Sequence, residues 1–186
     1  MKMNPWLGRI LAGALATVAL AALLGGPTRW RARWLVEDGA TLVSNEQYLP
    51  AARQLARAVA TAPRDARAHY YLGLAYAGLG QHAAALSHAE DAVRLAPQDP
   101  EYQAGLAALF LDAGRTPEAI AHLRRAAAIE PRSADIRLLL ADALRRAGDP
   151  DGMEREYRIA MRLAGGGTLG ALAHEQLKAA LEDSAP

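Results

Sequence analysis

The sequence predicts an all-α protein: a solenoid of about four helix–turn–helix repeats and a C-terminal capping helix, preceded by one N-terminal transmembrane helix. Three observations lead to this prediction. Aromatic residues make up only 5% of the 186-residue chain, while the helix-favouring residues Ala, Leu, Arg and Glu are abundant. Small residues, glycines and prolines recur at one fixed interval in most of the chain. An uncharged apolar stretch near the N-terminus has the length of a membrane-spanning helix.

The composition excludes several classes of function. The formal net charge of +1 provides no overall field that would attract or repel nucleic acid. The chain contains no cysteine. Disulfides, thiolate metal sites, a cysteine nucleophile and lipid attachment through an N-terminal cysteine are therefore excluded.

The first element is a predicted membrane anchor. The run ILAGALATVALAALLGG, from Ile10 to Gly26, is uncharged, and the uncharged stretch reaches about the 20 residues that a helix needs to cross a bilayer. Trp6 precedes the run, and Trp30 and Trp34 follow it, where interfacial aromatic residues are expected.

Removal as a secretory signal peptide is the alternative fate of this segment. Ala19 and Ala21 form a small-x-small site, but apolar residues continue past it to Leu24, so we predict an uncleaved single-pass anchor. Alanines spaced along one side of the anchor would let a second helix approach closely in lipid, although a general alanine bias also explains them. The residues assigned to the anchor are Ile10, Ala12, Ala16, Ala19 and Leu23.

Basic residues flank the anchor almost equally, so the positive-inside rule leaves its orientation open. Lys2 and Arg9 lie on one side, and Arg29, Arg31 and Arg33 lie on the other. A short tail before a single anchor most often stays inside. We therefore expect the repeats on the periplasmic side of a bacterial inner membrane, where the bacterial origin is itself a hypothesis from the Ala-, Arg- and Leu-rich composition.

A period of 34 residues organises the chain after the anchor. Four independent sets of residues share it, which chance composition does not explain. The sets are Pro63, Pro97 and Pro131; Gly80, Gly114 and Gly148; Ala51, Ala85 and Ala119, with Met153 in the fourth copy; and Ala58, Ala92, Ala126 and Ala160.

This pattern resembles the tetratricopeptide repeat, a 34-residue helix–turn–helix unit. In the clearest copy, Leu72-Gly73 and Tyr76 match the first helix, and Ala85, Ala92 and Pro97 match the second helix and its terminating proline. The first copy is degenerate, since Asp38 replaces the usual leucine. The resemblance implies repeats at residues 32–65, 66–99, 100–133 and 134–167, after a tail, anchor and juxtamembrane segment at 1–31 and before a capping helix and tail at 168–186.

Helix boundaries are signalled within the repeats. Asp99, Thr116 and Asp149 are each followed by proline and an acid, which predicts a cap residue with proline at the first helical position. The glycines of the periodic set are expected to close the first helix of each pair. The last segment, Thr168 to Glu182, reads as the capping helix that a solenoid end requires. Its expected apolar side carries Leu169, Leu172, Leu177 and Leu181.

We predict no catalytic residue, no metal site and no cofactor. None of the five histidines (His69, His82, His88, His122 and His174) forms an HExxH motif or an i, i+4 pair, and His88 and His122 share one repeat position. No GxSxG motif is present, and the glycines of GLAYAGLGQ form a helix-ending turn instead of a phosphate loop. Without a basic stripe, nucleic acid is not an expected partner, and no small-molecule substrate is expected.

The resemblance implies a protein-binding groove, because the family holds peptides or helices on a concave face built mainly from first helices. We expect this groove to be apolar near the membrane and charged at its far end, with Tyr70, Leu74 and Leu111 docking an apolar segment. The alternative is that neighbouring helices of the same short solenoid cover these residues. The implied groove residues are Val36, Ala40, Val43, Tyr70, Leu74, Ala77, Glu101, Ala104, Ala108, Leu111, Asp112, Asp135, Leu138, Asp142, Arg145 and Arg146.

One subtype of the family does not fit. Its members clamp a C-terminal carboxylate with lysines and asparagines, but Asn4 and Asn45, the only asparagines here, fall at no clamp position. Two functional hypotheses remain for a non-enzymatic, membrane-tethered interaction protein that contacts integral membrane proteins and, through its anchor, lipid. It is an accessory or scaffold subunit of a membrane complex, or a transient assembly factor for a membrane or periplasmic complex. An enzyme with an unrecognised site is a weaker third reading.

Overall fold

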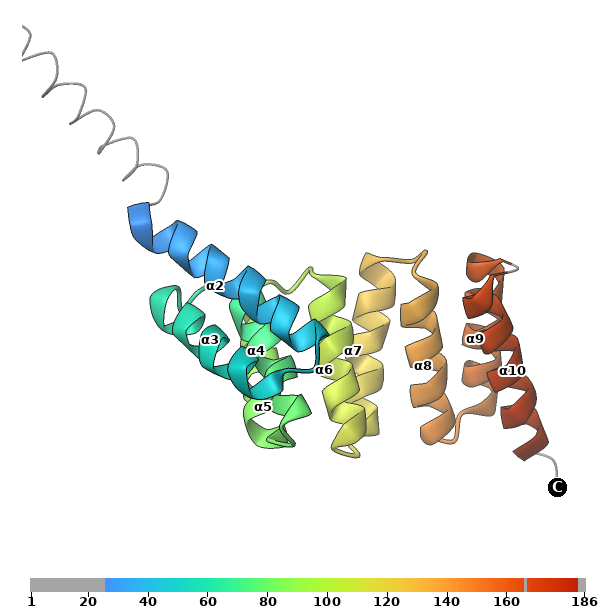
Figure 1. The fold of residues 1–186 in the computed structure, drawn as a ribbon. Coiled ribbons are helices and arrows are strands. Elements are labelled where there is room, and N and C mark those ends of the chain that lie inside the picture. Colours follow the sequence, from blue (N-terminus) through green and yellow to red (C-terminus); the bar gives the residue numbers. More distant parts are fainter. Residues whose placement is uncertain (1–25, 166, 184–186) are drawn as a thin grey trace, which may run out of the picture.

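In the computed structural model, the described residues, 26–165 and 167–183, form α-helices joined by short turns, with no strand among them. Four antiparallel hairpins follow one another along the chain and end on a final helix (Figure 1). The hairpins pair α2 (Gly26–Ser44) with α3 (Tyr48–Thr61), α4 (Ala66–Gly78) with α5 (His82–Leu95), α6 (Pro100–Asp112) with α7 (Thr116–Ile129), and α8 (Ala134–Arg146) with α9 (Pro150–Ala164), and the final helix is α10 (Thr168–Asp183).

The first helices of the hairpins line one side of the solenoid. Helices α2, α4, α6 and α8 contact one another in succession, and α10 contacts α8 as the next first helix would. Among the described helices, no second helix contacts another second helix. The first helices are therefore crowded together on the inner side, and the second helices are spread along the outer side.

Small residues at the repeat period allow the helices to approach closely. The alanines of the two periodic sets have no exposed surface: Ala51, Ala85 and Ala119, and Ala58, Ala92, Ala126 and Ala160. At Gly73 of α4, an added β-carbon would lie 3.1 Å from the backbone oxygen of Ala85 and 3.3 Å from the backbone nitrogen of Ala89. Larger side chains such as Leu55, Leu72, Leu106 and Leu123 fill the space between these contacts, as close packing requires.

One residue in the turn of each hairpin has a left-handed backbone, which glycine adopts at the least steric cost. Gly80, Gly114 and Gly148 have φ angles of 72°, 71° and 73°, which confirms that these glycines close the first helices. In the first hairpin the equivalent residue is Glu46, with a φ of 58°, and it is the only described residue other than glycine with a positive φ. The degenerate first repeat therefore carries local strain that the other three avoid.

Two of the three predicted proline-linked caps are present. Asp99 accepts from the backbone nitrogens of Glu101 and Tyr102, at 3.0 and 3.2 Å, and Asp149 accepts from that of Gly152 at 2.9 Å. The prediction for Thr116 is wrong, because Thr116 is the first residue of α7 and the cap position belongs to Arg115, whose side chain makes no cap hydrogen bond. Three of the second helices, α3, α5 and α7, start directly after the turn without a side-chain cap, and only α9 has one, from Asp149.

The face predicted for the final helix is confirmed for Leu169 and Leu177 and wrong for Leu172. Ala173, Leu177 and Ala180 are buried and Leu169 packs against the same core, whereas Leu172 is 44% exposed. A spacing of four, four and three residues keeps the buried set on one side of a helix, and Leu172 lies off that side.

The predicted transmembrane helix lies outside the described residues. This holds for all five residues assigned to the anchor: Ile10, Ala12, Ala16, Ala19 and Leu23. None of the described helices is long and apolar enough to span a bilayer.

We predict that Glu46→Gly stabilises the first hairpin by about 1 kcal/mol, because it removes the steric cost of a left-handed residue with a β-carbon. Thermal and urea unfolding of the full-length chain, followed by circular dichroism, measure the gain. Glu46→Ala is the matched control, since it removes the same carboxylate but keeps the β-carbon. An equal gain from both substitutions would show that the carboxylate, and not the backbone angle, is responsible.

Candidate functional site

A groove lies on the inner side of the solenoid, between α4, α6 and α8. Its volume is about 500 Å³, large enough for several side chains of a bound segment. The described residues that line it are Tyr70, Leu74, Ala77, Glu101, Ala104, Gly105, Ala108, Leu109, Asp112, Glu130, Ser133, Asp135, Ile136 and Leu139.

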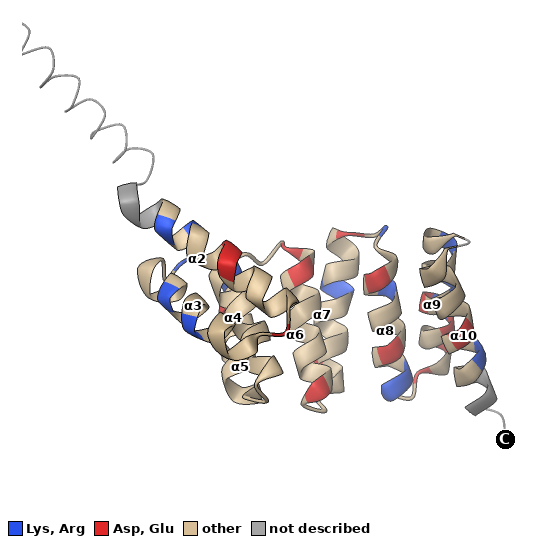
Figure 2. Cartoon of the chain, viewed as in Figure 1, with Lys and Arg blue, Asp and Glu red and all other residues tan. Residues whose placement is uncertain are grey.

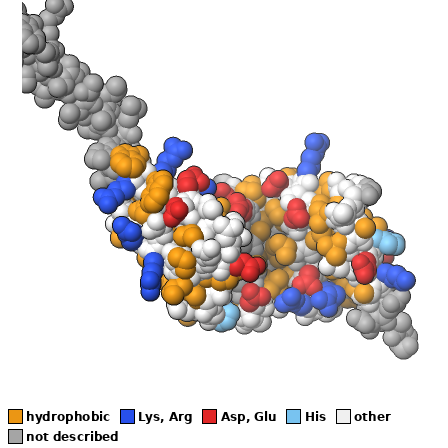
Figure 3. Space-filling view, in the orientation of Figure 1, with side chains coloured by type: hydrophobic (Ala, Val, Ile, Leu, Met, Phe, Trp, Pro, Cys, Tyr) orange, Lys and Arg blue, Asp and Glu red, His pale blue; other side chains and the backbone are white. Residues whose placement is uncertain are grey.

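The groove has an apolar lining and acidic edges. Four carboxylates border it, from Glu101, Asp112, Glu130 and Asp135, and no Lys or Arg is found among its described lining residues. All four residues are exposed, and none forms an ion pair with another described residue. In Figure 3, hydrophobic side chains occupy the middle of the drawn face, with acidic side chains around them. The described lining residues therefore give the groove a net negative charge.

Tyr70 forms one wall of the groove and is held in place by its neighbours. Its ring centroid lies 4.7 Å from that of Tyr102, and the ring covers Gly105, where a β-carbon would meet it at 2.6 Å. Burial, followed by the nearby charge of Glu101, raises the pKa of the Tyr70 phenol. The residue is only 8% exposed, so it supports the groove more than it projects into solvent.

The structure brings together eight of the groove residues assigned from the sequence. They are Tyr70, Leu74, Ala77, Glu101, Ala104, Ala108, Asp112 and Asp135. Three others are core residues, covered by neighbouring helices: Val36, Leu111 and Leu138 are 2%, 7% and 8% exposed. The expectation that Leu111 docks a partner is corrected accordingly. Ala40 is also buried, and Val43 is half-buried against the core between the first two hairpins.

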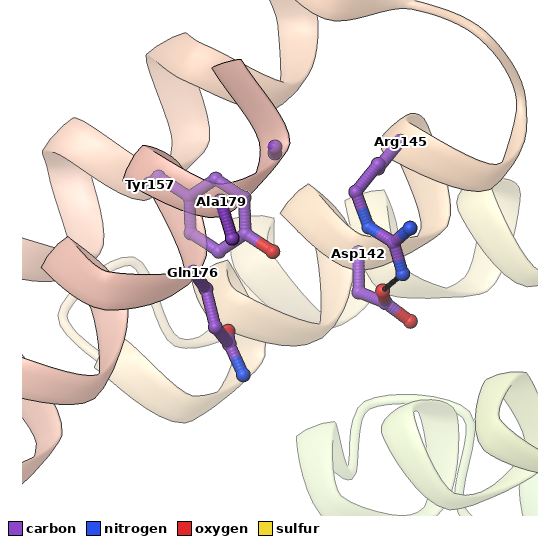
Figure 4. A pocket seen from close by; sticks show the side chains of 6 residues that line it. Asp142, Arg145, Tyr157, Gln176 and Ala179 are labelled. Carbon is purple, nitrogen blue, oxygen red and sulfur yellow. Dashed lines mark hydrogen bonds and ion pairs between the residues drawn. The ribbon is translucent and has the colours of Figure 1, made fainter. Parts of the chain in front are cut away.

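Asp142 and Arg145 belong to a different cavity, so the predicted charged end of the groove is not continuous with its apolar part. Asp142 bonds to Arg145 at 2.6 Å and to Arg146 at 2.9 Å, which neutralises its charge. Figure 4 shows the Tyr157 hydroxyl pointing toward this pair from the other side of the cavity. The cavity measures about 200 Å³ and is closed by Gln176, Ala179 and Ala180 of α10. This cavity is small and the charge of Asp142 is already paired, so it offers a partner protein few groups to bind.

A second polar feature was not predicted from the sequence. In each hairpin, one side chain of the second helix bonds to one of the first helix, and the second-helix member recurs at the 34-residue period. The pairs are Gln54 Nε2 to Asp38 Oδ2 at 2.8 Å, His88 Nδ1 with His69 Nδ1 at 3.1 Å, His122 Nδ1 with Gln103 Oε1 at 2.7 Å, and Arg137 Nη1 to Glu156 Oε2 at 2.9 Å.

These pairs fasten the two helices of each hairpin to each other and, in two cases, to the preceding turn. The side chain of Gln103 also donates to the carbonyl of Pro97 at 2.9 Å, and His69 Nε2 lies 3.1 Å from the carbonyl of Pro63. Pro63 and Pro97 thus end one repeat, and their carbonyl oxygens also accept hydrogen bonds from the first helix of the next repeat. The only clue in the sequence was the shared repeat position of His88 and His122.

The pair in the second hairpin has a third member. Asp91 Oδ2 lies 3.5 Å from His69 Nδ1, and ligand atoms of His69, His88 and Asp91 all lie within 4.8 Å of one another. Burial, followed by the proximity of His69, lowers the pKa of the His88 imidazole. The sequence-based argument against a metal-suited histidine pair does not hold for these two residues, because they come from different helices of one hairpin.

Family comparison identifies the repeats. The pattern of the tetratricopeptide repeat family matches residues 39–100 and, separately, residues 110–152. The chain contains tetratricopeptide repeats. No curated protein matches the sequence.

Several solved structures have the same fold, and one of them is described as a tetratricopeptide repeat protein. The thermophilic protein TTC0263 of Thermus thermophilus is 24% identical with a TM-score of 0.69, and the match covers 79% of each chain. A structure described as MamA MSR-1 C2 is 20% identical with a TM-score of 0.64, over 82% of this chain and 90% of that one. Another crystal structure of MamA protein is 19% identical with a TM-score of 0.66, over 82% and 87% of the two chains. At these identities, the likeness establishes the fold and nothing more specific.

We predict that Glu156→Ala destabilises the chain by about 3 kcal/mol, because it leaves the largely buried guanidinium of Arg137 without its carboxylate. Replacing both members, as Arg137→Met with Glu156→Leu, should restore most of this loss, since no buried charge then remains. Urea unfolding measures both effects.

Glu154→Ala is the matched control two residues away. It removes a more exposed ion pair with Arg158 and should cost less than about 1 kcal/mol. A cost of Glu156→Ala no larger than this would show that the Arg137–Glu156 pair does not fasten the hairpin.

Proposed function

We propose that the groove between α4, α6 and α8 binds a cationic amphipathic segment of a partner protein, and that the chain is a membrane-tethered accessory or scaffold subunit of a membrane protein complex. Tetratricopeptide repeat proteins are protein-interaction modules, and this groove is where the described chain offers a surface for such an interaction. The observation that carries the proposal is the combination of an apolar lining with four carboxylates that have no ion-pair partner among the described residues.

The apolar part of the groove supports a segment with a row of apolar side chains. Leu74, Ala77, Ala104 and Ala108 are half-buried, and Leu139 is 36% exposed. Small side chains on α6 leave room beside these leucines, so a helix could lay one apolar face along the groove, as in other helix-in-groove complexes.

The acidic edges support lysines or arginines on the flanks of that segment. Glu101 and Asp135 lie near the starts of α6 and α8, and Glu130, directly after the antiparallel helix α7, lies at the same end of the groove. Asp112, the last residue of α6, lies at the other end. Charged residues at both ends of the groove would orient a cationic segment and speed its association, while repelling an acidic one.

The exposed residues of α2 support membrane tethering. Trp30 and Trp34 are 65% and 56% exposed, and they lie four residues apart on one face of the helix. Arg31 and Arg33 are also exposed, and Figure 2 shows basic residues at this end of the described chain, on α2 and α3. Tryptophan and arginine together are the residues that anchor a helix in the headgroup region of a bilayer.

A transient assembly factor for a membrane or periplasmic complex is the alternative role. It would use the same groove and tether, but it would leave the partner once assembly is complete. We place the chain in a bacterial inner membrane with its repeats on the periplasmic side, because a short tail before one anchor most often stays inside.

We predict that the full-length protein binds a synthetic amphipathic helix with leucines on one face and lysines on the other. An otherwise identical peptide with glutamates in place of the lysines should not bind, because the groove repels it. Fluorescence titration measures both affinities, and binding of the lysine peptide should weaken as ionic strength rises.

Charge-reversed variants test whether the peptide binds in the groove. Asp112→Lys and Asp135→Lys should each weaken binding about tenfold, whereas Glu90→Lys on the outer helix α5 should have no effect. Leu74→Arg should also abolish binding, with circular dichroism confirming that each variant is folded. Equal binding by Asp112→Lys and Glu90→Lys would exclude the groove as the binding site.

We predict that the protein remains in the membrane fraction after carbonate extraction, and that a variant lacking residues 1–25 is released. Purification from native membranes in mild detergent, followed by quantitative mass spectrometry, then separates the two roles. Membrane proteins recovered at a fixed ratio would support a subunit, and substoichiometric partners would support an assembly factor. Release of the full-length chain by carbonate would contradict the tether.

A further inference from the structure

The second hairpin holds a cluster of metal-ligating side chains that is separate from the groove. His69 of α4 faces His88 and Asp91, which lie three residues apart on α5. The distance between the two Nδ1 atoms is 3.1 Å, and that from His69 Nδ1 to Asp91 Oδ2 is 3.5 Å. Ligand atoms bound at about 2.0–2.1 Å to a tetrahedral zinc ion are about 3.3 Å apart, so these separations suit two edges of such a site.

The tautomer of His69 is fixed by its other ring nitrogen. His69 Nε2 lies 3.1 Å from the carbonyl oxygen of Pro63, which can only accept, so Nε2 carries the proton. In the neutral ring, Nδ1 then presents a lone pair to His88 and Asp91. A backbone carbonyl that holds the far nitrogen of a histidine is also the usual outer partner of a metal-bound imidazole.

The third member distinguishes this cluster from the equivalent pairs in the other hairpins. In those pairs a donor meets an acceptor: Gln54 donates to Asp38, His122 can donate to Gln103, and Arg137 donates to Glu156. In the second hairpin, His88 Nδ1 can donate to the lone pair of His69 Nδ1, but a carboxylate oxygen of Asp91 also faces that lone pair, at 3.5 Å from Nδ1, and these two acceptors repel each other. A cation between them would turn this repulsion into attraction.

We propose that His69, His88 and Asp91 bind one divalent transition-metal ion, with Zn²⁺ as the best match. Imidazole nitrogens and a carboxylate oxygen are a ligand set that zinc accepts, with a water in the fourth position. The ion would cross-link α4 to α5.

The surroundings of the cluster are those of a supported site with an entrance. The ring of Tyr76 stacks on His88, with ring centroids 5.5 Å apart and an angle of 13° between the planes. Arg94 bonds to Asp91 Oδ1, which leaves Oδ2 for the ion. The side chain of His69 is 7% exposed and that of Asp91 33%, so the ion and its water would enter from the side of Asp91.

The test is a Zn²⁺ titration of the full-length protein, purified with a histidine-free tag and stripped of metal by a chelator. A competing indicator dye measures affinity and stoichiometry, and the visible spectrum of the Co²⁺ form reports tetrahedral coordination. We expect one ion per chain, a tetrahedral Co²⁺ spectrum and a rise in melting temperature with Zn²⁺.

His69→Gln is the decisive variant, because it creates in the second hairpin the Gln–His pair that the third hairpin already contains. It should therefore fold normally and yet bind Zn²⁺ at least about tenfold more weakly. His88→Gln and Asp91→Asn should weaken binding as well. His122→Gln is the matched control, since it removes the histidine that occupies the repeat position of His88 in the next hairpin. It should leave Zn²⁺ binding unchanged.

Two results would overturn the proposal. One is the absence of saturable Zn²⁺ binding at one ion per chain. The cluster would then be a hydrogen-bonded group of side chains that binds protons but no metal ion. The other is Zn²⁺ binding by His69→Gln as tight as in the unmodified chain, which would place the ion at other histidines. Neither result bears on the groove, because none of the three residues lines it.

Discussion

The close approach of helices at buried alanines is the constraint on which the rest of this structure depends. Ala85 and Ala92 of α5, and their counterparts one repeat away in each direction, have no exposed surface. A larger side chain at Ala85 or Ala92 would force apart either the two helices of the hairpin or two neighbouring hairpins, although the fourth hairpin accommodates Met153 at the position of Ala85. Because the spacing is fixed in this way, every other residue at a given repeat position meets an equivalent environment.

That equivalence explains the polar pairs. The position occupied by Gln54, His88, His122 and Glu156 always faces the first helix of its own hairpin, where a buried polar group needs a partner. The identity of the pair can change from hairpin to hairpin, provided that both members change together. The first hairpin shows what happens when they do not: Leu35 occupies the position equivalent to His69, and Gln54 reaches Asp38, one helical turn further on.

The sequence was sufficient to predict the hairpins, their turns and the capping helix, because period, glycine and proline act locally. It was not sufficient to predict which groove residues reach the surface. Leu111 and Leu138 lie on first helices, as expected, but their side chains are buried in the core that these helices form with their neighbours. The cluster of His69, His88 and Asp91 was missed for a related reason, since residues 19 positions apart meet only once the angle between two helices is known. Spacing rules for a single helix give no information about the angle between two helices.

One carboxylate of the acidic groove, that of Asp112, opposes the preference of the helix that carries it. Glu101 and Asp135 lie in the first turns of α6 and α8, where the helix dipole favours a negative charge, so they cost the fold nothing. Asp112 is different, because it is the last residue of α6, and a carboxylate there opposes the dipole. The equivalent residue of α8 is Arg146, which suits its helix end and pairs with Asp142, whereas Asp112 has no ion-pair partner within the described chain. A local preference broken without compensation is typical of residues retained for binding, and Asp112 lines the groove. This single residue therefore favours a cationic partner more strongly than the total charge of the groove does, since the other carboxylates are explained by the helices that carry them or by their place in a turn.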